Sequence, residues 1–145
     1  INARGFMKKV GSLSAALSKY KDMNASVRVG VLENATYPDG TPVAMVAFWN
    51  EYGTRTADPR PFFRTTVWEN KKNWAFSVQT LMKIHNDPKQ VMGLIGVHMQ
   101  EQIVQSINTW SDPPNSAYTI AKKGFDKPLV ETGVLMRSIK SEVGD

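Results

Sequence analysis

The fold is decided by residues 87–110, DPKQVMGLIGVHMQEQIVQSINTW, which carry the clearest helical pattern in the chain. Apolar residues recur there every four positions, at Val91, Ile95, Met99, Ile103 and Ile107. That spacing places them on one face of a helix. Asp87 suits the N-cap and Pro88 suits the first turn. We therefore expect a long helix from Pro88 to about Trp110, with one apolar face available for packing.

Two segments alternate in polarity as half-buried strands do. In residues 26–32, three valines alternate with polar residues or glycine, and residues 139–143 alternate again near the C-terminus. Alternation with a period of two is typical of a strand with one buried face. The expected fold class is therefore α+β: a small, mainly antiparallel sheet packed against the long helix and two or three shorter helices.

Further helices are expected before the long one. Thr41–Pro42 is a helix start, Gly53 is a left-handed stop, and the apolar residues between them predict a short buried helix. Residues 62–68 fit a strand or a helix, and we favour a helix over about Thr66–Ile84, anchored by Phe62–Phe63. A helix at about residues 3–21 is predicted by the apolar stripe Phe6, Val10, Leu13, Leu17 and Tyr20.

Two connections contain several prolines. Residues 55–61 are expected to form an extended arm, because Pro59 and Pro61 exclude a helix there. Residues 113–128 are expected to form a long loop, and loops of that length are often functional. The chain length of 145 residues fits one domain covering residues 1–145.

Composition argues against several classes of protein. The chain has no cysteine, which excludes disulfide scaffolds and thiol catalysis, and no apolar run long enough to span a membrane. Its two histidines fall on different predicted helices, and His98 with Glu101 gives only two of the three or more ligands that a metal needs. The sequence has neither a phosphate-binding glycine loop nor a nucleophile elbow. We expect no enzyme, and no catalytic, metal or cofactor residues.

Three arginines surround the pair Phe62–Phe63, namely Arg55, Arg60 and Arg64. Basic residues interleaved with aromatic ones can neutralise phosphates and stack bases, and the net charge of +5 is compatible with nucleic acid. Alternatively, the two phenylalanines anchor the core, and the arginines face solvent or a protein partner. The second interpretation is favoured, because no signature of a known nucleic-acid module is present.

Three segments together indicate a family. Residues 50–54 (NEYGT) precede residues 59–64 (PRPFFR), and residues 123–139 (KGFDKPLVETGVLMRSI) follow the long helix. The last segment includes Leu129, Thr132, Gly133, Ser138 and Ile139. In this order the segments resemble the tail-completion and neck proteins of tailed bacteriophages, a family of minor tail and virion morphogenesis proteins. Residues 33–40 are less similar to that family.

The resemblance implies a structural virion protein that forms a ring, expected to be a hexamer, at the head–tail junction. Its partners would be head-connector, tail-terminator or tail-tube proteins, and genomic DNA would pass through without sequence readout. It would be assembled in the bacterial host cytoplasm and reside in the virion. The alternative is a nucleic-acid-binding module that uses the arm Arg55–Arg64. The candidate assembly interface comprises Arg55, Arg60, Phe62, Phe63, Arg64, Lys123, Phe125 and Leu129.

Overall fold

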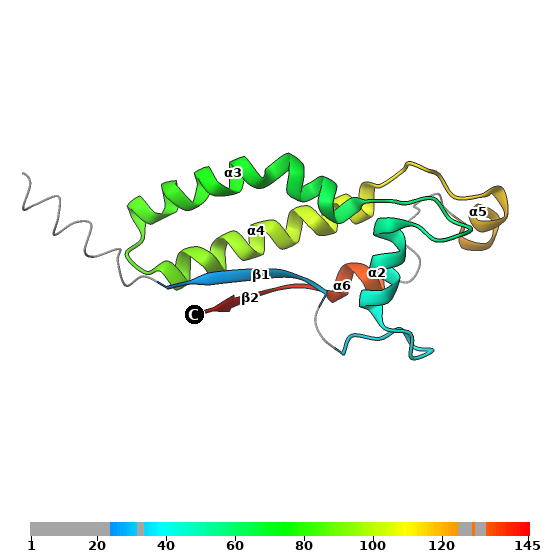
Figure 1. The fold of residues 1–145 in the computed structure, drawn as a ribbon, viewed down its shortest axis with the longest axis horizontal. Helices are drawn as coiled ribbons and strands as arrows, with labels where there is room; N and C mark the ends of the chain where they lie inside the picture. The colour runs from blue at the N-terminus through cyan, green and yellow to red at the C-terminus, as the bar shows by residue number, and fades with distance from the viewer. Residues whose placement is uncertain (1–23, 32–33, 125–128, 130–132) are drawn as a thin grey trace, which may run out of the picture.

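The computed structural model describes residues 24–31, 34–124, 129 and 133–145 of the chain. Within them the fold is α+β, as expected, with five helices and one two-stranded antiparallel sheet. The elements are, in chain order, β1 (Ser26–Val31), α2 (Val43–Tyr52), α3 (Phe62–Ile84), α4 (Pro88–Thr109), α5 (Ala117–Lys123), α6 (Val134–Ser138) and β2 (Ile139–Gly144) (Figure 1). The helix expected at residues 3–21 lies outside the described residues.

The sheet joins two segments from nearly opposite ends of the described chain. β1 and β2 pair antiparallel, with Val27 opposite Val143 and Arg28 opposite Glu142. The valines face α4, whereas Arg28 and Glu142 form an exposed ion pair at 3.3 Å on the other face. The alternation predicted from the sequence is confirmed over residues 26–29 of β1 and 139–142 of β2, whereas Val143 near the end of β2 is 38% exposed.

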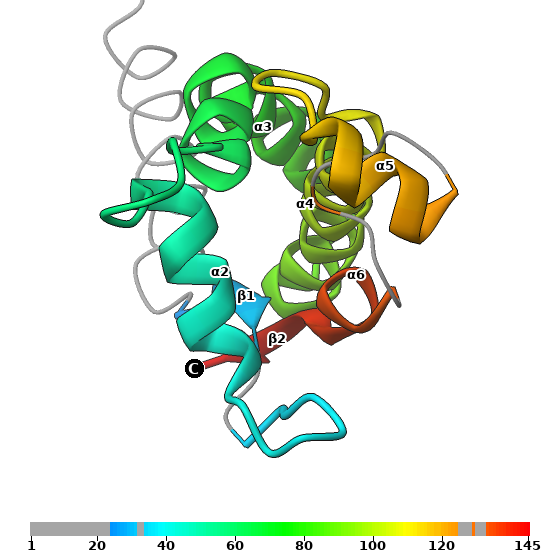
Figure 2. The same ribbon diagram turned by 90° about the vertical axis from the view of Figure 1, so that its right-hand side faces the viewer.

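α4 lies between the sheet and α3 (Figures 1 and 2). It packs against both strands on one side and against α3 on another. Asp87 caps it as predicted, because its carboxylate accepts a hydrogen bond from the backbone N–H of Lys89 at 2.9 Å. Four of its five periodic apolar residues are buried: Val91, Ile95, Ile103 and Ile107. The expected position of this helix against the sheet is confirmed.

The main core cluster lies where α4, α2, the start of α3 and the C-terminal segment meet. Its buried members are Val43, Phe62, Ile103, Ile107, Leu129, Leu135 and Ile139. Residues from α2, α3, α4 and the C-terminal segment therefore contribute to one core cluster.

Three expectations about helices are wrong. Pro42, not Thr41, is the N-cap of α2, and among the apolar residues of that helix only Val43 is buried. α3 begins at Phe62 rather than near Thr66, so with 23 residues it is slightly longer than α4 with 22. α5 occupies part of the expected loop at residues 113–128. It forms there because the Ser116 hydroxyl caps it by accepting a hydrogen bond from the Thr119 N–H at 3.2 Å.

The close contact between α4 and the sheet depends on Gly96. A Cβ added to Gly96 would lie 2.7 Å from Cγ2 of Val27 and 3.1 Å from Cβ of Ser141. One turn earlier, a Cβ on Gly93 would lie 3.9 Å from Cγ2 of Val143, an ordinary van der Waals distance. Only a glycine at position 96 lets the helix axis approach the strands this closely.

We predict that Gly96→Ala destabilises the protein relative to Gly93→Ala by about 1–3 kcal/mol, the usual cost of overpacking. Both substitutions gain the same helix propensity, up to about 1 kcal/mol, so their difference isolates the steric clash. Urea unfolding of the two variants measures it. Equal midpoints would show that the sheet can move away from α4 without cost.

Candidate functional site

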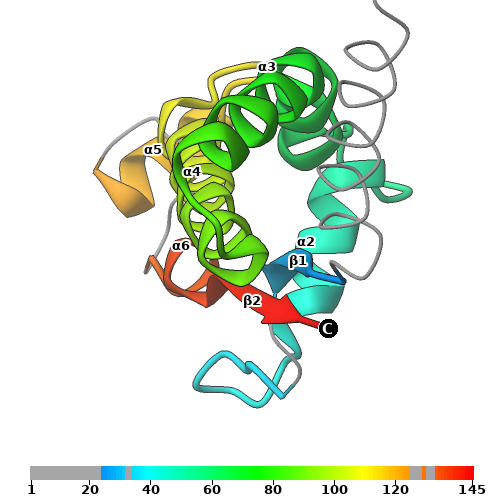
Figure 3. The same ribbon diagram turned by 90° about the vertical axis from the view of Figure 1, so that its left-hand side faces the viewer.

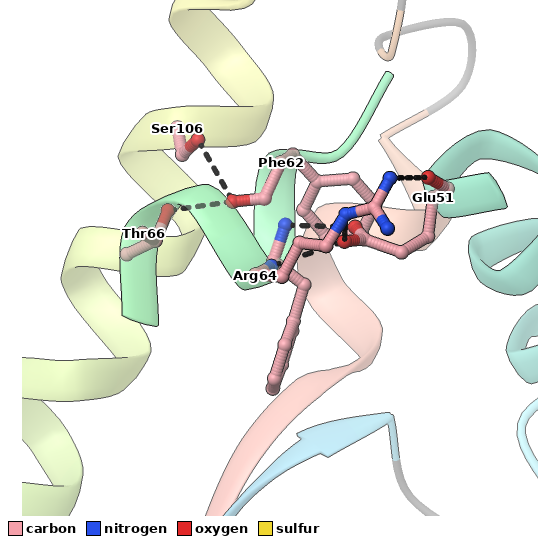
Figure 4. Close-up of polar contacts among 6 residues, drawn as sticks. Glu51, Phe62, Arg64, Thr66 and Ser106 are labelled. Carbon is pink, nitrogen blue, oxygen red and sulfur yellow. Dashed lines mark hydrogen bonds and ion pairs between the residues drawn. The ribbon is translucent and has the colours of Figure 1, made fainter. Parts of the chain in front are cut away.

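Glu51 connects α2 to α3 (Figure 4). Its side chain is only 9% exposed, and its two carboxylate oxygens accept hydrogen bonds from the first turn of α3. Oε2 accepts from the N–H of Phe63 at 3.0 Å, and Oε1 accepts from the N–H of Arg64 at 3.1 Å. These backbone groups have no partner within their own helix, and a negative charge is favourable at a helix N-terminus. A residue of one helix thus caps the next.

Arg64 completes this arrangement. Its Nε lies 3.2 Å from Oε1 of Glu51, and its Nη2 donates to the backbone oxygen of Glu51 at 3.1 Å. Its guanidinium carbon also lies 5.0 Å from the centre of the Tyr52 ring. A buried carboxylate is costly unless it is paired and hydrogen-bonded, and here both conditions are met. We call Glu51, Tyr52, Phe63 and Arg64 the Glu51 clasp.

The arm after α2 folds back onto that helix. Gly53 ends α2 with a φ of 79°, and a Cβ there would lie 2.9 Å from the backbone oxygen of Ala57. Its ψ of 176° differs from the left-handed helical cap that the sequence predicted. The N–H of Thr54 donates to Ala57 at 2.8 Å, and the N–H of Arg60 donates to Asn50 at 2.5 Å. The arm is therefore a closed turn, and the expectation of an extended one is wrong.

Two of the three arm arginines contact backbone oxygens of their own chain. Besides Arg64, Arg60 donates from Nε to the oxygen of Pro113 at 3.1 Å and from Nη2 to that of Pro114 at 3.4 Å. Arg60 thereby joins the arm to the segment after α4. Arg55 is exposed and lies in the bend that follows Gly53. Of the three guanidinium groups, that of Arg55 is the best placed to meet a partner.

α2 exposes an unusual amount of apolar surface for a ten-residue helix. Four of its large side chains are exposed: Met45 (48%), Phe48 (59%), Trp49 (43%) and Tyr52 (58%). The rings of Phe48 and Tyr52 are 4.7 Å apart. They border a groove of about 260 Å³ with Phe62 and Ile139 among its lining residues. We call Met45, Phe48, Trp49 and Tyr52 the exposed α2 face.

The other residues expected at the assembly interface differ from one another in burial and in position. Phe62 and Leu129 are buried in the core at 1% and 7% exposure, so they support the surface and do not form it. Phe63 is half-buried and packs against Phe62 edge-to-face, which confirms the pair as the anchor of α3. Lys123 is the last residue of α5, and Phe125 lies outside the described residues.

Sequence reasoning missed the exposed α2 face because it expected this helix to be buried. A signal was present: residues 43–49 are apolar on nearly every face. A helix at the edge of a small domain buries only one face, so such a sequence leaves large apolar side chains in solvent unless other elements surround it.

Three further observations concern metal ligands, membrane-spanning helices and similarity to known proteins. His98 and Glu101 are both exposed, and in the described part of the chain no three His, Cys, Asp or Glu residues gather as metal ligands would. None of the described helices is long and apolar enough to cross a membrane. Comparison with known protein families, curated proteins and solved structures found no match.

We predict that Glu51→Ala destabilises the protein by about 2–4 kcal/mol, because two backbone donors and Arg64 lose their partner in a largely buried place. Glu51→Gln should cost less, since one amide oxygen can still cap α3. The control is Glu142→Ala, which removes an exposed ion pair and should change stability by less than about 0.5 kcal/mol. Thermal unfolding compares the three, and similar losses at positions 51 and 142 would contradict the clasp.

Proposed function

We propose that this chain is a structural virion protein of a tailed bacteriophage and forms a ring at the head–tail junction, as a tail-completion or neck component. The observation that carries the proposal is the exposed α2 face, which leads into residues 50–54 and 59–64, two of the three segments that resemble this family. The Glu51 clasp and the Gly53 turn hold that face and its flanking arm in a defined shape.

The composition of this surface suits a protein contact. Interface centres are enriched in aromatic residues and Met, and arginine is common at binding hot spots. The exposed α2 face supplies the apolar centre, and Arg64, whose guanidinium lies over the Tyr52 ring, stands at its edge. A ring forms when one surface of each subunit binds a different surface of the next. In this proposal the exposed α2 face is one member of that pair.

The neighbours of the ring follow from the resemblance. One side would bind a head-connector protein, and the other a tail-terminator or tail-tube protein, with six copies expected in the ring. Genomic DNA would pass through the lumen without sequence readout. The net charge of +5 supports tolerance of a passing polyanion, and no chemistry is required of the subunit.

The test is Trp49→Asp. We expect the wild-type chain to form rings, measured by size-exclusion chromatography with light scattering and by electron microscopy. The variant should stay folded, because Trp49 is already 43% exposed, but its subunit association should weaken at least about 30-fold, which corresponds to about 2 kcal/mol or more.

Gln79→Asp, an equally charged change at an exposed position of α3, is the control and should assemble as the wild type does. Rings of normal stability from Trp49→Asp would contradict the assigned contact. A chain that stays monomeric but binds DNA with a steep salt dependence, lost in Arg55→Glu, would favour the nucleic-acid module instead.

A further inference from the structure

One side of α4 is covered neither by α3 nor by the sheet. Among the described residues, α3 packs against α4 and α2 but reaches neither strand (Figure 3). On α4, Gln102 bonds to Trp74 of α3, whereas Gly96 contacts Val27 of β1. Successive helical residues are about 100° apart, so Met92 and Met99 point between these two directions. Both methionines are half-buried.

The neighbouring elements extend this apolar surface. On α3, Val67, Val78 and Met82 are half-buried and lie on the flank that also carries the exposed Arg64 and Lys71. On β1, Val27 is half-buried beside Gly96. We call this set the apolar strip: Val27, Val67, Val78, Met82, Met92 and Met99. It runs along α4, between α3 and β1.

The chain contains a segment that matches the strip in length and polarity. Residues 3–21 carry the apolar stripe of an amphipathic helix, and such a stripe needs a surface on which to be buried. As a helix this segment would be about 28 Å long, and α4, with 22 residues, is about 33 Å long. The segment leads into β1 at Ser26, at the end of the strip near the connection between α3 and α4 (Figure 1).

We propose that residues 3–21 of the same chain form a helix that covers the apolar strip. The helix would run back along β1, antiparallel to that strand and parallel to α3. Its apolar stripe faces the strip, with Leu17 near Val78 and Tyr20 near Met82. The occupant is the chain's own segment, because a connection as short as residues 22–25 gives it an effective concentration in the millimolar range. This proposal does not depend on ring assembly.

A thiol crosslink tests the position of the segment. These 145 residues contain no cysteine, so Leu17→Cys with Val78→Cys introduces the only two thiols among them. Treatment of the dilute protein with a short bis-maleimide should join them within one chain at least tenfold faster than in the control, Ala15→Cys with Val78→Cys, whose first residue lies on the opposite side of the helix. Equal rates would overturn the proposal. A product joined between two chains would also overturn it, by showing that a second copy covers the strip.

Two matched substitutions test whether residues 3–21 stabilise the protein by covering the apolar strip. Leu17→Asp should lower Tm by about 5–10 °C and accelerate amide hydrogen exchange in residues 67–82, because a charge cannot be buried on the strip unpaired. Ala15→Asp introduces the same charge on the solvent side and should change Tm by less than about 2 °C. Identical Tm and exchange for the two variants would overturn the proposal.

Discussion

The burial of α4 on two sides is the constraint on which the other positions depend. It is the one described helix that packs against both strands and against α3. Its stripe of Val91, Ile95, Ile103 and Ile107 is buried, and Gly96 removes the side chain that would hold the sheet away. Because a two-stranded sheet is marginal alone, β1 and β2 need this helix, and α3 has no contact with the strands to replace it.

The Glu51 clasp fixes the position of α2 relative to α3. α3 is fixed by α4, and its first turn is bound by the carboxylate of Glu51, so α2 is fixed in turn. Gly53 then lets the chain turn back within van der Waals distance of its own backbone. Interface residues held in this way lose little conformational entropy on binding. The clasp thus explains how a ten-residue helix can hold a partly apolar surface in a defined shape, as the proposed ring contact requires.

The apolar surfaces of this protein differ in a way that bears on their use. On the exposed α2 face, Phe48, Trp49 and Tyr52 are about half exposed and Arg64 lies over the Tyr52 ring, as in surfaces that bind another protein. The apolar strip has smaller or more flexible side chains, which are half-buried. Half-buried valine and methionine side chains of this kind are typical of a domain interior, where methionine fills irregular gaps between other side chains. The first surface therefore suits a partner subunit, and the second suits a segment of the same chain.

The sequence by itself determined what neighbouring residues control. The helix α4 with its Asp87 cap, the two alternating strands, the stop at Gly53 and the α+β class were all predictable, because periodicity, caps and turn residues act over a few positions. Only the tertiary structure decided that Glu51 caps α3, that Arg60 binds the oxygens of Pro113 and Pro114, and that α2 leaves its large side chains exposed. The contacts of Glu51 and Arg60 join residues far apart in the chain, so no local sequence pattern contains them. Whether a face of α2 is buried depends on which elements the whole fold places around that helix, and a local pattern does not contain that either.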